Sequence, residues 1–522
     1  MIPILDSGQM RAADGAAIRG GTPSLTLMEN AARGVASAVR ARFRRWRSAV
    51  VVCGPGNNGG DGLAVARLLA GDLAVRVFTL RDPDGYRGDP AVNLRRAREA
   101  GLSLESLSRP GGMETLTLAM EDADGIIDAL FGTGLDRPLE GVAADVVLAI
   151  NRAGRTVVAV DVPSGLSSDT GAVTGVAVDA AVTVALAAPK ICHAFPPARR
   201  LCGALVVVEI GIPRSLLESE GHGLYLATAD GIRGLLPARS RGAHKGDAGR
   251  VAIVAGSRGK TGAAVLAARG ALRAGAGLVT VLCPASLEPV VVAALPEAMT
   301  QGLPERDGFL DSPAATEIVR RLEEFDAAVL GPGLGTSPET VAAIEQVVRA
   351  GRIPLLLDAD GLNAFAGRAD ALARRTGPLV ATPHPGEAGR LLGRPAKDVQ
   401  ADRLGAAREL ARRTRSCVLL KGEASLTTTP EGRVVVNSSG TPLLATAGSG
   451  DVLSGVIAAL LAAGLAPPDA AAAGAWLHGA AGEHLEGKLG DTGLLAHEVA
   501  DAVPLVRRAL GSGTVKPAIE DA

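Results

Sequence analysis

The sequence predicts an α/β protein of two domains, each built around a parallel sheet. Its 522 residues are too many for one ordinary domain and suit two large α/β units. Short β-branched runs alternate with helical patterns through both halves, which is the order of a parallel sheet with crossover helices. Between the halves, residues 211–246 lose this alternation and collect Gly, Pro and charged residues, which is typical of an inter-domain connection.

Each half has its own set of expected strands. In the first half they are residues 49–53, 74–78, 125–130, 156–160, 181–186 and 204–210. In the second half they are residues 250–255, 277–282, 327–330, 353–357, 379–381 and 416–420. The glycine motifs of the two halves differ, so we interpret the chain as a fusion of two enzymes rather than a tandem repeat. The last twelve residues are polar, and we expect them to be disordered.

Composition limits the classes of partner and the cellular compartment. The 54 basic and 55 acidic residues leave a net charge of −1, so no global field attracts nucleic acid or a membrane, and we expect small-molecule partners. The five cysteines are scattered and never spaced C-x-x-C, which argues against a disulfide framework and a zinc site. The sequence shows neither a secretory signal nor a run of 18 apolar residues, so we expect a cytoplasmic protein.

A glycine-rich motif, GPGNNGGDG at residues 54–62, follows the strand that ends at Cys53 and leads into a helix. Glycines in such a turn let backbone N–H groups approach a ligand, and a helix N-terminus favours a phosphate. The alternative is a plain tight turn. Asn57, Asn58 and Asp61 add polar side chains that a purely structural turn would not need.

Two further strand ends of the first half carry polar clusters. Asp128 precedes the loop 132–138, and Asp161 and Ser164 follow the next strand. Because the carboxyl ends of parallel strands share one edge of the sheet, we expect all three motifs to converge. Asn58, Asp128 and Ser164 offer only oxygen ligands, which suit a hard cation rather than zinc or copper. For each residue alone, the alternative is an Asx-turn or a helix cap.

These motifs, NNGGDG (57–62), DALFGTGL (128–135) and DVPSG (161–165), resemble the YjeF N-terminal family of NAD(P)HX epimerases over residues 1–215. The resemblance implies a Rossmann-like three-layer domain that interconverts the R and S hydrates of NADH and NADPH. It also implies a potassium ion held by Asn58, Asp128 and Ser164. Asp161 is our candidate catalytic acid/base, because burial and a nearby cation can tune the pKa of a carboxylate at a strand end. The implied hydrate-binding residues are Asn57, Asn58, Gly59, Gly60, Asp61, Gly132, Thr133, Gly134, Leu135, Asp136, Arg137, Pro138 and Asp161.

The most informative segment of the second half is GSGD, residues 448–451, which opens a long apolar helix. The free N–H groups of such a helix start can hold phosphoryl oxygens, and Asp451 can take a proton from an attacking hydroxyl. The alternative is a helix cap with an Asp in the first turn. His384 lies in a loop between two prolines, where we favour ligand contact. Lys421 ends a strand, where it could reach a nucleotide phosphate or be a solvated lysine.

Together with GPGLG (331–335), DADGLN (358–363), TPHPGE (382–387) and LKG (420–422), this segment resembles the YjeF C-terminal family. These proteins are ADP-dependent NAD(P)HX dehydratases with a ribokinase-like α/β fold, and the match covers residues 225–510. The implied ADP-binding residues are Lys421, Gly422, Glu423, Ala424, Ser425 and Gly450, and the implied hydrate-binding residues are Ala263, Gly333, His384 and Asp451. The resemblance also implies magnesium with the nucleotide. Gly361 departs from the family's usual Ala.

The combined interpretation is a repair enzyme for hydrated nicotinamide cofactors. Its substrates are NADHX, NADPHX and ADP, its dehydratase products are NAD(P)H, AMP and phosphate, and the resemblance suggests a homo-oligomer. In the implied reaction Asp451 is the catalytic base, and the transferred phosphoryl group turns a poor leaving group into a good one. The chief rival is a ribokinase-like kinase of a hydroxymethylpyrimidine or a sugar, which would retain a phosphorylated product. A non-catalytic dinucleotide sensor or scaffold is a third possibility, against which the acidic residues Asp161 and Asp451 argue.

Overall fold

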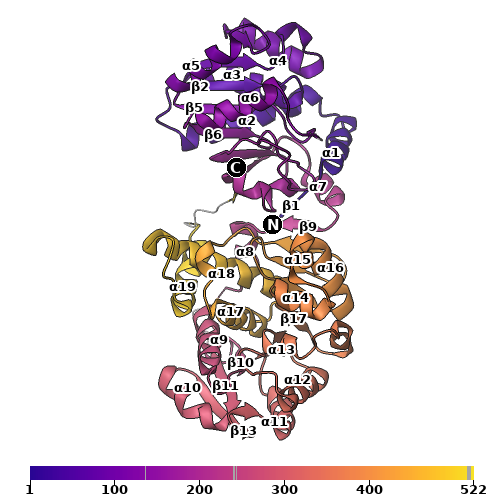
Figure 1. Cartoon of the computed structure of the whole chain (residues 1–522), viewed down its shortest axis with the longest axis vertical. Coiled ribbons are helices and arrows are strands. Elements are labelled where there is room, and N and C mark those ends of the chain that lie inside the picture. The colour runs from indigo at the N-terminus through magenta and orange to yellow at the C-terminus, as the bar shows by residue number, and fades with distance from the viewer. Residues whose placement is uncertain (136, 239–241, 243, 514–518, 522) are drawn as a thin grey trace. The chain divides into compact units, whose positions relative to one another are not determined.

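The computed structural model describes residues 1–135, 137–238, 242, 244–513 and 519–521. These residues form two compact units (Figure 1). The first unit contains residues 2–226 and the strand β21 (Ile519–Asp521). The second contains Met1 and the described residues from 227 to 513.

The first unit is built around a parallel sheet in the order β21-β8-β7-β6-β5-β2-β3-β4. Its remaining strands are β2 (Ser48–Cys53), β3 (Ala74–Thr79), β4 (Leu104–Ser106), β5 (Gly125–Ala129), β6 (Thr156–Val160), β7 (Val182–Leu186) and β8 (Ala204–Val208). The chain runs outward from β2 to β4 and then returns to place β5 on the other side of β2. The sheet order therefore reverses between β2 and β5, and ligands bind at such a point in open α/β sheets.

Helices cover both faces of this sheet. They are α1 (Ser7–Arg19), α2 (Ser24–Arg42), α3 (Asn57–Leu69), α4 (Gly88–Glu99), α5 (Gly112–Asp122), α6 (Val142–Arg152) and α7 (Arg214–Glu220). The strand β2 shows the alternation: Val51 belongs to the cluster packed by α2 and α3, whereas Val50 and Val52 belong to the cluster packed by α5 and α6. Opposite faces of one strand thus supply two cores, which makes this a three-layer unit. The strand β1 (Ile2–Pro3) pairs antiparallel with β9 (Leu224–Leu226), from the other end of this stretch of chain.

The second unit has a larger sheet in the order β20-β19-β18-β17-β16-β15-β10-β11-β12. The strands are β10 (Arg250–Val254), β11 (Leu278–Pro284), β12 (Met299–Leu303), β15 (Ala327–Leu330), β16 (Leu355–Leu357), β17 (Leu379–Ala381), β18 (Cys417–Leu420), β19 (Leu426–Thr428) and β20 (Val434–Val436). All pairs from β12 to β18 are parallel, and β19 and β20 complete the sheet as antiparallel strands. Here the order reverses between β10 and β15. A separate two-stranded ribbon joins β13 (Glu305–Arg306) to β14 (Phe309–Leu310).

The second unit has its own set of helices, of which the central one, α17, packs against the sheet. They are α8 (Ala229–Arg233), α9 (Thr261–Ala274), α10 (Glu288–Ala294), α11 (Ser312–Leu322), α12 (Pro338–Ala350), α13 (Asp360–Asn363), α14 (Pro385–Leu392), α15 (Ala396–Ala401), α16 (Arg403–Thr414), α17 (Ser449–Ala462), α18 (Pro467–Leu489) and α19 (Ala496–Gly511). A Cβ on Gly270 of α9 would lie 2.4 Å from the carbonyl oxygen of Val452, and one on Gly455 would lie 1.9 Å from that of Ala267. Only glycine allows α9 and α17 to approach this closely, and the contact fixes the start of α17.

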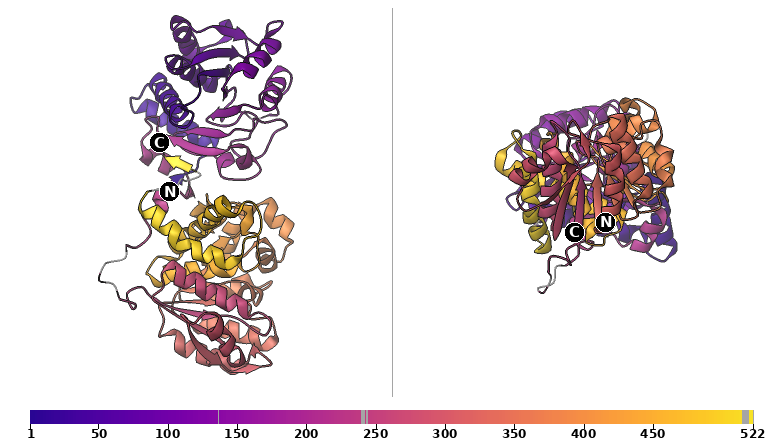
Figure 2. Two further views of the ribbon diagram at one scale, coloured as in Figure 1. Left: turned by 90° about the vertical axis from the view of Figure 1, so that its left-hand side faces the viewer. Right: turned by 90° about the horizontal axis from the view of Figure 1, so that it is seen from below.

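The predicted α/β fold class is confirmed, and the differences concern short strands. The sequence pattern missed β1, β4, β9, β12, β13, β14, β19 and β20, which are too short or too polar to show a clear alternation. The chain end differs from the expected disorder at residues 519–521, while residues 514–518 and 522 lie outside the described residues. Residues 519–521 form β21 and pair in parallel with β8, as the short yellow strand in the left view of Figure 2 shows. None of the helices in the described ranges is long and apolar enough to cross a membrane.

Candidate active sites

The first candidate site is a cavity of about 540 Å³ at the carboxyl ends of the first unit's strands. Residues from α1, α2 and the loops after β2, β5, β6 and β7 line it. The predicted binding residues that line it are Asn57, Asn58, Asp61, Gly132, Thr133, Gly134, Leu135 and Asp161. Arg137 and Pro138 are exposed and do not line the cavity, and Asp136 lies outside the described residues. The structure thus brings together the three motifs whose convergence the sequence predicted.

The glycines of the NNGGDG motif allow α3 to begin directly against β2. A Cβ on Gly59 would lie 1.8 Å from the carbonyl oxygen of Gly54, and one on Gly60 would lie 3.0 Å from the Met28 side chain. Gly59 is therefore needed for packing, Gly60 is closely packed, and neither lines the cavity. No side chain caps the N-terminus of α3, and Gly56 and Asn57 at that end face the cavity. The free N–H groups of this helix start suit a phosphate group.

Asp128 and Ser164 form a buried oxygen cluster at the end of β5. The Asp128 carboxylate accepts hydrogen bonds from the Ser164 backbone N–H (2.8 Å), the Ser164 hydroxyl (2.7 Å) and the Leu130 N–H (3.2 Å). Burial raises the pKa of Asp128 to about 6, although these hydrogen bonds oppose the shift. Asn58 is also buried, and its Nδ2 has no hydrogen-bond partner among the described residues. Asp128 and Ser164 therefore offer a buried carboxylate and a hydroxyl, oxygen ligands of the kind that suit a hard cation. Asn58 lies near the loop after β5, since its Oδ1 would be 3.2 Å from a Cβ on Gly132.

Asp161 is held at the cavity wall by a lysine that the sequence motifs did not indicate. Its Oδ1 accepts a hydrogen bond from the Leu186 N–H (3.1 Å) and pairs with the ammonium group of Lys190. Lys190 is almost fully buried and also donates to the Leu186 carbonyl oxygen at 2.8 Å. The φ angle of Asp161 is +63°, a left-handed conformation that is unusual for a residue other than glycine. An isolated lysine after a strand looks like a solvated one, so sequence reasoning missed Lys190.

Two further carboxylates face the same cavity. Asp61, from α3, is buried, and this burial together with the charges of Asp161 and Asp14 raises its pKa well above the usual range. Burial and the charge of Asp161 also raise the pKa of Asp14, although Lys190 opposes the shift. The cavity therefore holds a lysine-paired carboxylate beside two carboxyl groups whose pKa is raised. Such an arrangement can both donate and accept protons.

The second candidate site begins at the N-terminus of α17, which no side chain caps. Gly448 adopts φ +85° as the N-cap residue, and Asp451 lies in the first turn. Burial, followed by the charge of Asp358, raises the pKa of Asp451 to about 7. His478 of α18 supports this turn, since its Nε2 lies 3.1 Å from the Ser449 hydroxyl and 3.0 Å from the Ser449 carbonyl oxygen. A free helix N-terminus beside a carboxyl group that titrates near neutrality can bind a phosphoryl group and accept a proton.

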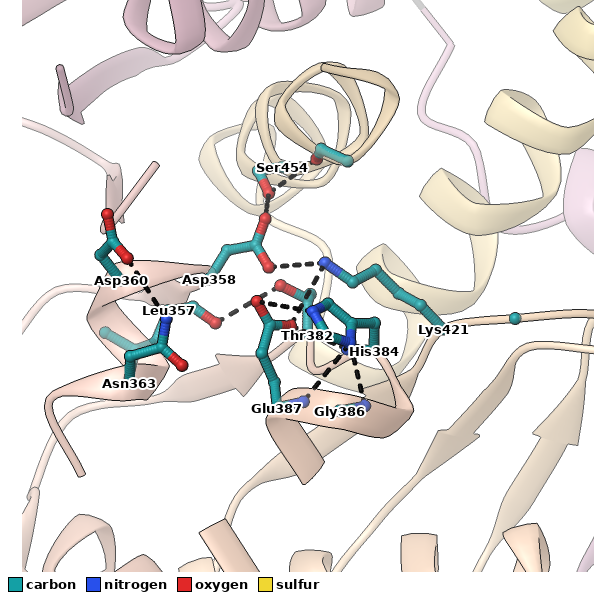
Figure 3. Close-up of polar contacts among 12 residues, drawn as sticks. Leu357, Asp358, Asp360, Asn363, Thr382, His384, Gly386, Glu387, Lys421 and Ser454 are labelled. Atoms are coloured by element: carbon teal, nitrogen blue, oxygen red, sulfur yellow. Dashed lines mark hydrogen bonds and ion pairs between the residues drawn. The ribbon is translucent and has the colours of Figure 1, made fainter. Parts of the chain in front are cut away.

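Lys421 is not the solvated lysine that the sequence left open. It is largely buried, and its Nζ lies 2.7 Å from Asp358 and 3.8 Å from Glu387 (Figure 3). Burial alone would lower the pKa of Lys421, but the carboxylates of Asp358 and Glu387 raise it overall. These two carboxylates hold the Lys421 ammonium group in place. The ammonium group lies close to α17, since a Cβ on Gly450 would be 3.5 Å from its Nζ.

The segment from Lys421 to Ser425 forms a tight turn. Gly422 and Ala424 have φ angles of +137° and +53°, and the Gly422 N–H donates to the Ser425 hydroxyl at 3.2 Å. Arg403 of α16 donates to the carbonyl oxygens of Lys421 (3.3 Å) and Ala424 (3.4 Å). Five of the six predicted nucleotide-binding residues thus share one turn, whereas Gly450 lies on α17, and Arg403, which the motifs did not indicate, stabilises the turn.

The predicted hydrate-binding residues come from separate elements: Ala263 from α9, Gly333 from the loop after β15, His384 from the N-cap of α14 and Asp451 from α17. A Cβ on Gly333, whose φ is +62°, would lie 3.0 Å from the Cβ of Ala263, so these two residues are adjacent. His384 is half exposed and caps α14, where its Nδ1 accepts from the Gly386 N–H at 2.9 Å (Figure 3). Partial burial and the charge of Lys421 lower the pKa of His384. The ring is therefore neutral at physiological pH and orders the helix, in addition to the ligand contact that we predict.

Comparison with known proteins shows matches in both halves. A family model described as YjeF-related protein N-terminus matches residues 24–192, and one described as NAD(P)H-hydrate dehydratase matches residues 251–505. The bifunctional NAD(P)H-hydrate repair enzyme Nnr of Moorella thermoacetica is 43% identical over 94% of this chain and 93% of its own length. That of Thermofilum pendens is 40% identical over 95% and 94%, and that of Escherichia coli is 35% identical over 91% and 87%.

Among solved structures, an ADP/ATP-dependent NAD(P)H-hydrate dehydratase from Bacillus subtilis co-crystallised with ATP/Mg²⁺ aligns with a TM-score of 0.48 and 33% identity. The alignment covers 55% of this chain and 98% of that one. The resemblance inferred from the motifs of both halves is confirmed by the family models and by the relatives that match nearly the full length. This chain belongs to the family of bifunctional NAD(P)H-hydrate repair enzymes.

Proposed function

We propose that this protein restores hydrated NADH and NADPH by two reactions. The domain spanning residues 1–215 interconverts the R and S forms of NAD(P)HX. The domain spanning residues 225–510 dehydrates S-NAD(P)HX with ADP and releases AMP and phosphate. The observation that carries this proposal is that a bifunctional repair enzyme matches 94% of the chain, so that both sites lie within the match. The family resemblance also supports self-association and a cytoplasmic location, which stay predictions.

The geometry of the second site supports phosphoryl transfer followed by elimination. Asp451 accepts the proton of the C6 hydroxyl group, and the hydroxyl oxygen attacks the terminal phosphoryl group of ADP. The free N–H groups at the start of α17 stabilise the phosphoryl oxygens, and AMP leaves. The C6–O bond then breaks, phosphate departs with the bonding electrons, and loss of the C5 proton restores the C5–C6 double bond. Phosphate is a far better leaving group than hydroxide.

Magnesium would arrive with the nucleotide. In proteins this ion is commonly held by substrate phosphates and water together with one or two carboxylates. Among the described residues, no group of three or more His, Cys, Asp or Glu side chains could form a cage for it. Magnesium bound in this way would neutralise charge on the phosphoryl oxygens. The proposed contacts for the nucleotide are Gly450 and the turn from Lys421 to Ser425.

In the first site, Asp161 is the proposed acid/base for epimerisation. Opening the hydrated ring requires removal of the C6 hydroxyl proton, and closure on the opposite face returns it. Asp161 faces the cavity in a fixed orientation because the Leu186 N–H and Lys190 both hold its Oδ1. The N-terminus of α3 and the loop 132–135 supply the proposed contacts to the phosphates of the dinucleotide.

Potassium held by Asn58, Asp128 and Ser164 would supply counter-charge beside these phosphates. Its presence should also stabilise the folded protein, because an ion that binds only the native state shifts the folding equilibrium by mass action. We expect thermal unfolding to occur at higher temperature in KCl than in choline chloride of equal ionic strength. The gain in stability is about 2.7 kcal/mol at a potassium concentration 100 times Kd. Asp128→Asn should abolish the difference, whereas equal midpoints for the unsubstituted protein in both salts would contradict the potassium site.

The test of the proposed function is recovery of reduced-nicotinamide absorbance from a mixture of R- and S-NADHX. With ADP and magnesium, we expect the unsubstituted protein to restore the absorbance of both hydrates and to release phosphate. Without ADP, no absorbance should return. If neither ADP nor ATP supports recovery, the dehydratase function is wrong, and formation of a stable phosphorylated product would identify a kinase instead.

A further inference from the structure

Asp358 is a buried carboxylate that none of the predicted binding or catalytic roles includes. It follows β16 directly, and its side chain is 2% exposed. One carboxylate oxygen accepts a hydrogen bond from the Lys421 ammonium group at 2.7 Å, and the other accepts one from the Ser454 hydroxyl at 2.7 Å (Figure 3). Asp358 therefore joins the turn that carries Lys421 to the helix that carries Asp451.

The contacts of Asp358 lie within one turn of the proposed catalytic base. Ser454 is three residues after Asp451 on α17, so the two side chains share a face of the helix. The Ser454 hydroxyl also lies 3.1 Å from the Gly450 carbonyl oxygen, and Gly450 itself adjoins Lys421. Without Asp358, the Lys421 ammonium group would keep its longer contact with Glu387 (3.8 Å) and could turn towards Asp451.

Several charged groups act on Asp451, and Asp358 is the strongest of them. After burial, the charge of Asp358 makes the largest contribution to the raised pKa of Asp451, and Asp360 and Glu387 add smaller ones. Lys421 acts in the opposite direction. Further out, Lys260 pairs with Asp360 at 3.2 Å, and His384 and His478 each have a pKa lowered by the charge of Lys421, after burial.

We propose that Asp358 is a positioning residue of the dehydratase site, which holds Lys421 away from Asp451 and keeps a negative charge beside that base. This inference rests on the proposed dehydratase function. Asp451 then stays free to accept the substrate proton, while Lys421 remains a fixed cation at the nucleotide turn. A purely structural Asp358 would change stability alone, because it would leave the proton affinity of Asp451 as it is.

Two substitutions with opposite expected shifts test the inference. Asp358→Asn keeps the shape of the side chain but removes its charge, and it also releases Lys421 towards Asp451. Both changes lower the pKa of Asp451, so the acidic limb of kcat/KM for NADHX should move to lower pH by about one unit, because nearby charges shift a pKa by about that much. Lys421→Gln removes the opposing cation, so the limb should move to higher pH. Asp370→Asn, at an exposed ion pair with Arg413, is the matched control and should leave the profile unchanged.

The measurement is the pH dependence of ADP-dependent NADH recovery from S-NADHX, with thermal unfolding recorded for each variant. Opposite shifts in the two variants support the positioning role. An Asp358→Asn profile that overlies that of the unsubstituted protein overturns it, as does a downward shift in Lys421→Gln. If Asp358→Asn does not fold, the direction of the Lys421→Gln shift decides. Inactivity of the unsubstituted protein would overturn the proposed function together with this inference, whereas failure in the variants alone overturns only the inference.

Discussion

Asp451→Asn should reduce ADP-dependent dehydration by roughly 10²–10⁴-fold in kcat, the usual contribution of a positioned general base. The asparagine amide retains the size of the carboxylate but accepts no proton at neutral pH. Nucleotide binding should change little, because the free N–H groups of α17 and the turn at Lys421 remain. Recovery of reduced-nicotinamide absorbance from S-NADHX measures the first effect, and calorimetric titration with ADP and magnesium measures the second.

The rate of dehydration should also depend on pH in a predictable direction. A general base works only when deprotonated, and the pKa of Asp451 is raised to about 7 by burial and by the charge of Asp358. In the unsubstituted protein, kcat/KM should therefore rise with pH through about 7 and level off above it. A rate that stays constant from pH 5 to 8, or full activity in Asp451→Asn, would contradict the assignment of Asp451 as the base.

Asp161→Asn should abolish epimerisation while leaving dehydration intact, again with a loss of roughly 10²–10⁴-fold. Recovery from a mixture of R- and S-NADHX should then stop at the S fraction, since the R form can no longer be converted. Chiral chromatography of the unreacted hydrate, which should be the R form alone, measures this directly. Dehydration is unaffected because Asp451 lies in the other unit.

The Lys190 ammonium group makes a stability control necessary for this substitution. Removing the charge of Asp161 leaves a buried lysine without its ion-pair partner, and breaking a buried pair in this way typically costs about 3–5 kcal/mol. Thermal unfolding must therefore show that the first unit remains folded under the assay conditions. Asp124→Asn offers a matched control, because this exposed carboxylate accepts hydrogen bonds from Arg47 and Ser48 at the amino end of β2. Epimerisation that survives in a folded Asp161→Asn protein would show that another group moves the proton.

The two candidate sites were predictable because their signals are local. In NNGGDG and GSGD, glycines needed for a sharp turn stand beside polar residues at the start of a helix, and each motif follows or precedes a recognisable element. The alternation of strands and helices predicted parallel sheets, and the shared edge of a parallel sheet predicted that Asn58, Asp128 and Asp161 would converge. Asn58 and Asp161 line one cavity, and Asp128 is hydrogen-bonded to Ser164 of the DVPSG motif, which agrees with that expectation.

The buried partners of Asp161 and Lys421 were not predictable in this way. Lys190 and Asp358 follow apolar strands, as many solvated residues do, and nothing adjacent in the sequence indicates their partners. Lys190 pairs with Asp161, which lies 29 residues earlier in the chain. Asp358 pairs with Lys421, which lies 63 residues later. The pairing exists only because the strand order places those loops side by side.

The sequence by itself determined the α/β class, the two sheets, the family and the positions of Asp161 and Asp451, because these depend on periodicity and on local turn chemistry. Only the tertiary structure decided which charges are buried and paired. Burial sets the cost of ionisation, and neighbours from distant loops offset or increase it, so the proton affinity of Asp451 and the charge around Asp161 depend on packing rather than on motif. The strand β21 shows the same limit, since residues 519–521 pair with β8, a strand far away in the sequence that no local pattern indicates.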